Sequence, residues 1–286
     1  MNRASLKDIP LQPMPFSGWA PKVHRVLFAL FLIQWVLVWA RLWLPCPPFG
    51  GTRWPDGLLV VLTAATLLAS LTCHLPGQNV MLGSLMIAFI AGAVETLGAL
   101  TAIPFGPFVY SDAVGQQLYY PLPWVVPMLW IVALLSSRGV ARLILRPWRN
   151  TTNYGYRLIG LATLLVVLMD FGFEPFATQV KRLWKWTPTR LRLDWYTAPC
   201  VNFLGWGVTA LLILAFITPA LINKKPMKQS LPDCHPLAVW LLLNVLFETG
   251  AAVNQLWPAV LAISASTITV TVLAVRGGLS RPRVVS

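Results

Sequence analysis

Carboxylic acids inside and beside apolar segments are the side chains of this sequence best suited to chemistry. Glu95 lies in a long apolar run, and Asp112 follows it in the next polar segment. A charged side chain in a transmembrane helix costs roughly 2.5–3.5 kcal/mol, so such a residue is expected to face a cavity or a partner. Apolar walls favour the protonated form of a carboxyl group. Glu95 is therefore predicted to be a general acid. The alternative is a structural carboxyl group bonded to a neighbouring helix.

A second group of acids lies among aromatic residues and comprises Asp170, Glu174 and Asp194. An acid beside indole rings could donate a proton while the aromatic faces stabilise the resulting cation. The alternative is an interfacial belt, in which Trp and Tyr lie at headgroup depth and Lys side chains reach towards water. The side chains expected to line such a pocket are Tyr110, Trp184, Trp186, Tyr196, Asn202 and Trp206. Glu95 and Asp170 are the predicted proton donor or water activator, with Asp112, Glu174 and Asp194 in supporting roles.

Other polar residues are interpreted as structural. Glu248 and Asn244 are one helical turn apart and would share a helix face, which favours a hydrogen bond to a neighbouring helix. The four arginines between 138 and 149 indicate membrane orientation and contact with anionic lipids. The four cysteines are far apart and include no C-x-x-C pair, so they are expected to be buried thiols.

The framework that positions these side chains is predicted to lie in a membrane. Of the 286 residues, 57% are hydrophobic and only 11% are charged, about half the charged fraction of an ordinary soluble domain. The mean hydropathy is +0.67. Runs without a charge at 57–94, 195–223 and 249–275 are each long enough to cross about 30 Å of hydrocarbon. This composition excludes a water-soluble globule.

We therefore expect an all-α, polytopic transmembrane bundle of about eight helices. Residues 1–286 would form a single integral membrane domain, with a polar N-terminal segment at 1–22 and a motif-bearing core at 80–225. No small-residue cleavage site follows the first apolar stretch, so that stretch is expected to remain as an anchor. The predicted spans are 23–44, 57–74, 79–102, 118–137, 155–172, 201–222, 236–256 and 258–275.

The distribution of basic residues predicts the orientation of these spans. With both termini in the cytoplasm, 15 of the 22 Lys and Arg residues lie on the inner side, as the positive-inside rule requires. The exception is the basic and aromatic segment at 181–192, which would lie outside. The same topology places six of the nine acids towards the outer face. The three histidines, His24, His74 and His235, fall towards the opposite face.

No redox or metal chemistry is expected from the motifs. The sequence has no H-x-x-x-H pair, no G-x-G-x-x-G after a strand and no D-D-x-x-D. Histidines and the outer carboxylates would lie at opposite faces, which disfavours a mixed metal centre. We therefore predict that the protein uses no cofactor and no metal, and that it does not bind nucleic acid.

Two blocks of motifs resemble the integral-membrane carotenoid biosynthesis proteins, a family that includes bisanhydrobacterioruberin and γ-carotene 1'-hydratases. The resemblance covers about residues 80–225. Its motifs are Glu95-x-x-Gly98, Pro104-Phe-Gly106-x-x-x-Tyr110, Pro127-x-x-Trp130, Asp170-x-x-x-Glu174-Pro175, Trp184-x-Trp186 and Pro199-x-x-Asn202-Phe-x-Gly205-Trp206.

The resemblance implies addition of water to the terminal double bond of a linear carotenoid, without redox cofactor or metal. Protonating a trisubstituted alkene gives a tertiary carbocation, which needs an acid, a stabilising wall and an ordered water. The expected partners are a carotenoid or another isoprenoid lipid and membrane lipids, and the expected location is the cytoplasmic membrane of a prokaryote. The alternative is a transporter or lipid-binding membrane protein in which the acids form a proton relay.

Overall fold

The protein is a bundle of membrane-length helices. The computed structural model describes residues 18–44, 54–188, 193–221 and 232–280. Within these residues, eight helices are long and apolar enough to span a membrane, which confirms the all-α, polytopic prediction. They are α1 (Ala20–Trp43), α2 (Trp54–Thr72), α3 (Gly77–Thr101), α4 (Val125–Ile144), α5 (Tyr154–Pro175), α6 (Cys200–Ile217), α7 (His235–Val253) and α8 (Trp257–Leu279).

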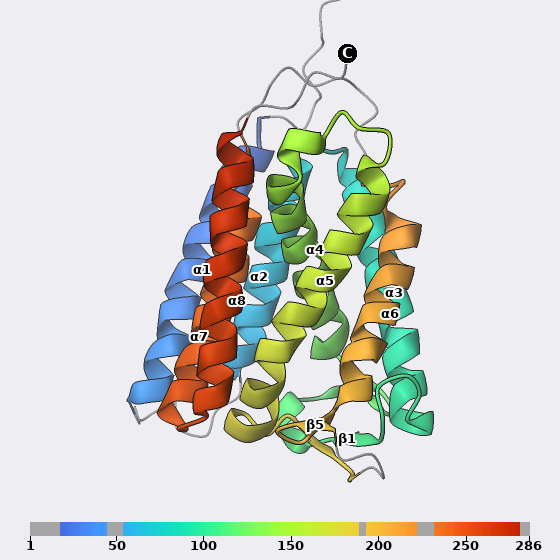
Figure 1. The fold of residues 1–286 in the computed structure, drawn as a ribbon, viewed down its shortest axis with the longest axis vertical. Helices are drawn as coiled ribbons and strands as arrows, with labels where there is room; N and C mark the ends of the chain where they lie inside the picture. The colour runs from blue at the N-terminus through green and yellow to red at the C-terminus, as the bar shows by residue number, and fades with distance from the viewer. Residues whose placement is uncertain (1–17, 45–53, 189–192, 222–231, 281–286) are drawn as a thin grey trace, which may run out of the picture.

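The helices surround α4, which packs against α2, α3, α5, α7 and α8. Most of the α4 side chains are accordingly buried, whereas less than a third of the residues in the spans of α1 and α8 are buried. Successive helices run in opposite directions, so α1 begins and α8 ends at the same end of the bundle (Figure 1). Short strands gather at the other end, which we call the strand end (Figure 1). The orientation of this bundle relative to the cytoplasm stays a prediction.

The fourth and fifth predicted spans have wrong boundaries because polar or irregular segments adjoin these helices at the strand end. The fourth helix covers Val125–Ile144 rather than 118–137, since the preceding residues form a hairpin of β2 (Gln117–Tyr119) and β3 (Leu122–Pro123). The fifth helix continues beyond the predicted end at 172 to Pro175, followed by the π-helical turn η3 (Phe176–Val180). It continues because Asp170 and Glu174 are buried inside the bundle rather than ending the span.

The sequence did not predict the strands that close this end. β1 (Phe108–Tyr110) pairs antiparallel with β4 (Trp184–Trp186), with Phe108 opposite Trp186 and Tyr110 opposite Trp184. A second pair joins β5 (Asp194–Trp195) to β6 (Ala198–Pro199). A short 3₁₀ turn, η1 (Asp112–Val114), follows β1, and another, η2 (Arg146–Trp148), follows α4. Strands of two or three residues carry too short an alternation to be told from a loop.

The three histidines lie together at the opposite end of the bundle, as expected. His24 and His235 meet edge to face, with ring centroids 4.3 Å apart, and His74 Nε2 is 4.0 Å from Asp233 Oδ2. A carboxylate lies with them that the sequence analysis did not assign to either face: Asp233 hydrogen-bonds His235 Nδ1 at 2.7 Å and accepts from Ser70 Oγ at 2.5 Å. Burial acts to raise the pKa of Asp233, but these hydrogen bonds outweigh it and hold that pKa below its usual value.

Candidate functional site

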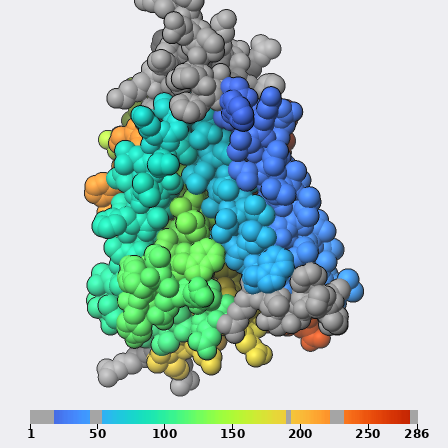
Figure 2. Space-filling model, turned by 180° about the vertical axis from the view of Figure 1, so that it is seen from behind, coloured from blue at the N-terminus to red at the C-terminus, as the bar shows by residue number. Residues whose placement is uncertain are grey.

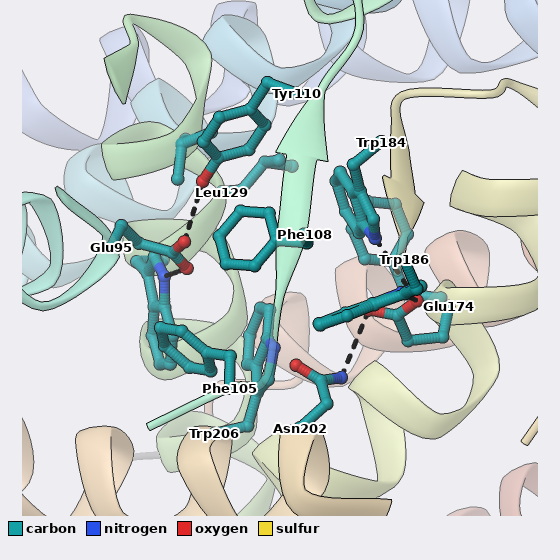
Figure 3. A pocket seen from close by; sticks show the side chains of 13 residues that line it. Glu95, Phe105, Phe108, Tyr110, Leu129, Glu174, Trp184, Trp186, Asn202 and Trp206 are labelled. Carbon is teal, nitrogen blue, oxygen red and sulfur yellow. Dashed lines mark hydrogen bonds between the residues drawn. The ribbon is translucent and has the colours of Figure 1, made fainter. Parts of the chain in front are cut away.

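The β1–β4 ladder holds four aromatic side chains over the strand end of the bundle. Side chains alternate between the two faces of a strand, so Phe108 and Tyr110 share one face with their partners Trp184 and Trp186. Phe108 and Trp184 are buried on this face, whereas Val109 between the first pair is exposed. The short sheet therefore turns an aromatic surface inwards, towards the acids of α3 and α5 (Figure 3).

Glu95 on α3 is buried and receives two hydrogen bonds from neutral donors. Tyr110 Oη donates to Oε2 at 2.7 Å, and Trp130 Nε1 on α4 donates to Oε1 at 2.8 Å. Burial, together with the neighbouring Glu95 carboxylate, raises the pKa of the Tyr110 hydroxyl well above its usual value. Tyr110 therefore keeps its proton and remains a donor to Glu95.

Asp170 and Glu174 lie one turn apart on α5 and share the amide group of Asn202 on α6. Asn202 Nδ2 donates to Asp170 Oδ2 at 3.0 Å and to Glu174 Oε1 at 3.1 Å. The other Glu174 oxygen, Oε2, accepts from Trp184 Nε1 at 3.3 Å and from Trp186 Nε1 at 3.1 Å. All three polar residues are 1% exposed, so this network is sealed from bulk water.

A small cavity of about 30 Å³ lies between Glu95 and Glu174 (Figure 3). Such a volume can hold about one water molecule where polar partners are available. Here the available partners are the two carboxyl groups, the Tyr110 hydroxyl and the Asn202 amide. The remaining wall is aromatic or aliphatic and consists of Phe105, Phe108, Val126, Leu129, Trp130, Phe173, Trp184, Trp186 and Trp206.

A much larger cavity of about 750 Å³ lies next to it, which we call the large cavity. Its walls come from α1, α2, α4, α5, α6 and α7 and are mostly apolar. Asp170 lines the large cavity, whereas Glu174 and Asn202 line the small one. Leu129, Phe173 and Trp206 line both, so these three side chains separate the two spaces.

Phe105, in the loop after α3, forms part of the wall of the small cavity and is held there by close packing. Phe105 lies between α3 and α6, at positions where both helices carry glycine. A Cβ atom added at Gly98 would lie 2.6 Å from Phe105 Cδ2, and one added at Gly205 would lie 2.7 Å from Phe105 Cδ1. Only glycine leaves room for the ring at these positions. Trp130 and Trp206 stack beside it, with centroids 4.1 Å and planes 19° apart.

The structure brings together most of the residues predicted to form the site, but not all. Glu95, Tyr110, Glu174, Trp184, Trp186, Asn202 and Trp206 line the small cavity, and Asp170 lies next to them. Asp112 and Asp194 are exposed and line neither cavity. Tyr196 is also outside both, and its hydroxyl accepts a hydrogen bond from the Ala259 backbone N–H at 3.1 Å. Ser264 on α8 donates to Glu248, which confirms a contact between helices there.

Several site residues were absent from the predicted set. Trp130 belongs to one of the resemblance motifs, and its position three residues after Pro127 was the available signal. Phe105 is the central residue of the Pro104-Phe-Gly106 motif, Phe108 follows that motif two residues later, and both line the small cavity. Phe173, between the two acids of α5, and Asp56, at the start of α2, carried no signal in the sequence.

Comparison with known proteins identifies the family of the chain. A family described as carotenoid biosynthesis protein matches residues 56–270, well over half of the chain. Bisanhydrobacterioruberin hydratase from Haloarcula japonica is 26% identical over 145 residues, which are 49% of this chain and 45% of that protein. This match spans less than half of the relative's length. No solved structure is significantly similar to the chain. Because the family match covers well over half of the chain, the chain belongs to the carotenoid biosynthesis protein family.

Proposed function

We propose that the protein adds water to the terminal double bond of an acyclic carotenoid end and forms a tertiary alcohol. The observation that carries this proposal is the pairing of a water-sized cavity between two carboxyl groups with a large apolar cavity that contains a third. An alkene and a water molecule can thus approach one another from two different compartments. Family membership and the hydratase relative support carotenoid chemistry.

Asp170 is the proposed proton donor. Its Oδ2 accepts from Asn202, but its Oδ1 is buried and has no hydrogen-bond partner among the described residues. A protonated carboxyl group at this position would have an O–H free to point into the large cavity. Transfer of this proton to the less substituted carbon of the terminal double bond leaves a tertiary carbocation and an Asp170 carboxylate.

Glu174 is the proposed base, assisted by Glu95. Three neutral N–H groups donate to Glu174, and two neutral donors bond Glu95, and such hydrogen bonds offset part of the cost of burying a carboxylate. A water in the small cavity would attack the carbocation and form the C–O bond, and its proton would pass to Glu174. Proton transfer from Glu174 back to Asp170 then restores both groups, so the overall reaction consumes only the alkene and one water.

The aromatic partition between the cavities is proposed to stabilise the cation. Phe173 and Trp206 line both spaces, and Trp130 stacks against Trp206. The negative face of an aromatic ring attracts a cation, and an indole does so most strongly. The carbocation would also be shielded from bulk water here. The acids and the amide around these rings are almost completely buried, so bulk water does not reach this part of the bundle.

Isotope labelling tests this proposal directly. Membranes containing the protein and a carotenoid with an acyclic end are expected to form a product heavier by one water, without dioxygen or NAD(P)H. The new oxygen should come from labelled water. Label from dioxygen, or a strict requirement for a reductant, would contradict hydration and indicate an oxygenase. No product from folded protein would favour the transport or lipid-binding alternative.

A further inference from the structure

We infer that the polyene enters the large cavity through the side of the bundle, between the start of α2 and residues 113–125. Only its reacting end would occupy the cavity, while the rest of the chain stays in the lipid. This inference rests on the proposed function for the identity of the ligand, an acyclic polyene hydrocarbon. The lateral opening itself rests on the geometry of the large cavity.

Among the residues that the structure describes, the exposed part of the cavity wall lies along these two segments. Trp54, Leu58 and Val61 on α2 line the cavity and are 51%, 38% and 39% exposed. Across from them, Gly115 and Gln116 also line the cavity and are exposed. Figure 2 shows the surface hollowed between the start of α2, in light blue, and the green segment that leads into α4. The α2 side of this opening is apolar, as expected for a passage used by a hydrocarbon.

The walls formed by α4 and α7 are closed. Val132, Leu243 and Leu246 are each at most 7% exposed and separate the cavity from the lipid around α4 and α7. At the strand end, Lys181 Nζ forms an ion pair with Asp56 Oδ1 at 2.8 Å and ties the segment after α5 to the start of α2. The same ammonium group is 5.7 Å from the centre of the Phe176 ring. A hydrocarbon would therefore pass beside this ion pair, between α2 and residues 113–125.

The large cavity is shorter than a C40 polyene, so part of a bound polyene must remain in the opening. The α2 residues that line it run from Trp54 to Thr63, a rise of about 13 Å along the helix. A C40 polyene is about as long as the hydrocarbon core is thick, roughly 30 Å. Less than half of such a chain fits inside with its terminal double bond beside Asp170. The remainder must leave by the route through which the end entered.

Gly57 provides the clearance at this opening. It lines the cavity on α2, and a Cβ atom added there would lie 3.4 Å from Trp124 Cζ2 and 3.6 Å from Trp124 Cη2. A Cβ would thus fit in ordinary contact, but a longer side chain would fill the space between α2 and the start of α4. Gly160 on α5 offers a matched control, because an added Cβ there meets nothing within 4 Å.

A binding measurement separates this inference from the reaction. Purified protein in lipid nanodiscs is loaded with lycopene, an acyclic C40 polyene. The pigment retained after size exclusion is quantified by visible absorbance as the excess over protein-free nanodiscs of the same lipid. We expect Gly57→Leu to lower retention at least about tenfold and Gly160→Leu to leave it unchanged. Shortening the opposing side chain by Trp124→Phe in the Gly57→Leu background should restore part of the binding. Val61→Trp, at an exposed position of the same rim, should block entry independently if Gly57→Leu fails to fold.

The possible results distinguish the two proposals. Equal retention by wild-type protein, Gly57→Leu and Val61→Trp would overturn the lateral entrance, and so would absence of retention by folded wild-type protein. Retention that depends on Gly57, without any hydrated product, would support the entrance and contradict the hydratase proposal. Hydrated product formed equally by wild-type protein and both blocked variants would support the hydratase and contradict the entrance.

Discussion

Asp170 and Glu174 lie one helical turn apart on α5, yet they line different cavities. The Asn202 amide bridges them from α6. This relationship places one carboxyl group beside the space that fits a hydrocarbon and the other beside the space that fits one water. Two acids with the same burial can therefore take opposite roles in proton transfer, because their partners differ.

Replacing the proposed donor should abolish turnover without unfolding the protein. Asp170→Asn keeps the shape of the side chain but removes its transferable proton, so the rate of hydration should fall at least about 100-fold. Product formation per mole of protein is the measurement, with thermal unfolding in detergent to confirm the fold. Glu248→Gln is the matched control, since Glu248 bonds Ser264 away from both cavities, and its activity should stay near wild type. Near-normal turnover in Asp170→Asn would reject its role as acid.

Glu95 is expected to matter as much for the rate as Asp170, because it is proposed to assist the attack of the water molecule. Glu95→Gln should preserve folding and lower the rate at least about 100-fold, because an amide cannot carry the negative charge with which Glu95 is proposed to assist proton transfer from the water to Glu174. Tyr110→Phe removes only one of the two donors to Glu95 and should reduce the rate less. Single-turnover kinetics of the two variants should show the larger loss of rate for Glu95→Gln. A Glu95→Gln variant with normal turnover would make Glu95 a structural residue.

The glycine at position 205 should be necessary for stability rather than for chemistry. A Cβ atom there would lie 2.7 Å from Phe105 Cδ1 and 2.9 Å from the Pro104 carbonyl oxygen. Gly205→Ala should therefore lower the free energy of unfolding by about 1–3 kcal/mol, the usual cost of overpacking. Gly160→Ala should leave stability unchanged or raise it, since alanine favours the helix and nothing obstructs its Cβ. Equal thermal midpoints for the two variants would contradict the close packing around Phe105.

The orientation of the bundle can be measured with reporter fusions. The positive-inside rule predicts cytoplasmic termini and an external strand end. A reporter fused after Ser280 should be active in the cytoplasm, and one fused after Thr187, which follows β4, should be active outside. The opposite pair of signals would invert the bundle and place the site at the cytoplasmic face. Two cytoplasmic signals would contradict the eight-helix arrangement.

The sequence alone determined the class of the protein and much of its site. Eight apolar runs predicted eight helices, because crossing hydrocarbon requires a backbone that satisfies its own hydrogen bonds. The rarity of buried charge singled out Glu95, Asp170 and Glu174. Asn202 and the tryptophans came with them through the motifs. The separation of the histidines from these acids also followed from the order of the spans, since each crossing reverses direction.

Tertiary structure decided which of these residues meet, and for physical reasons that no local pattern carries. Asp112 and Asp194 carry the same side chain as Asp170, but they lie in exposed segments outside the bundle. Pairing of β1 with β4 joins segments more than 70 residues apart and turns their aromatic side chains inwards. The two cavities exist only where six or more elements fail to fill the space between them. Whether a buried acid faces water or hydrocarbon depends on those distant walls, and only the folded bundle sets them.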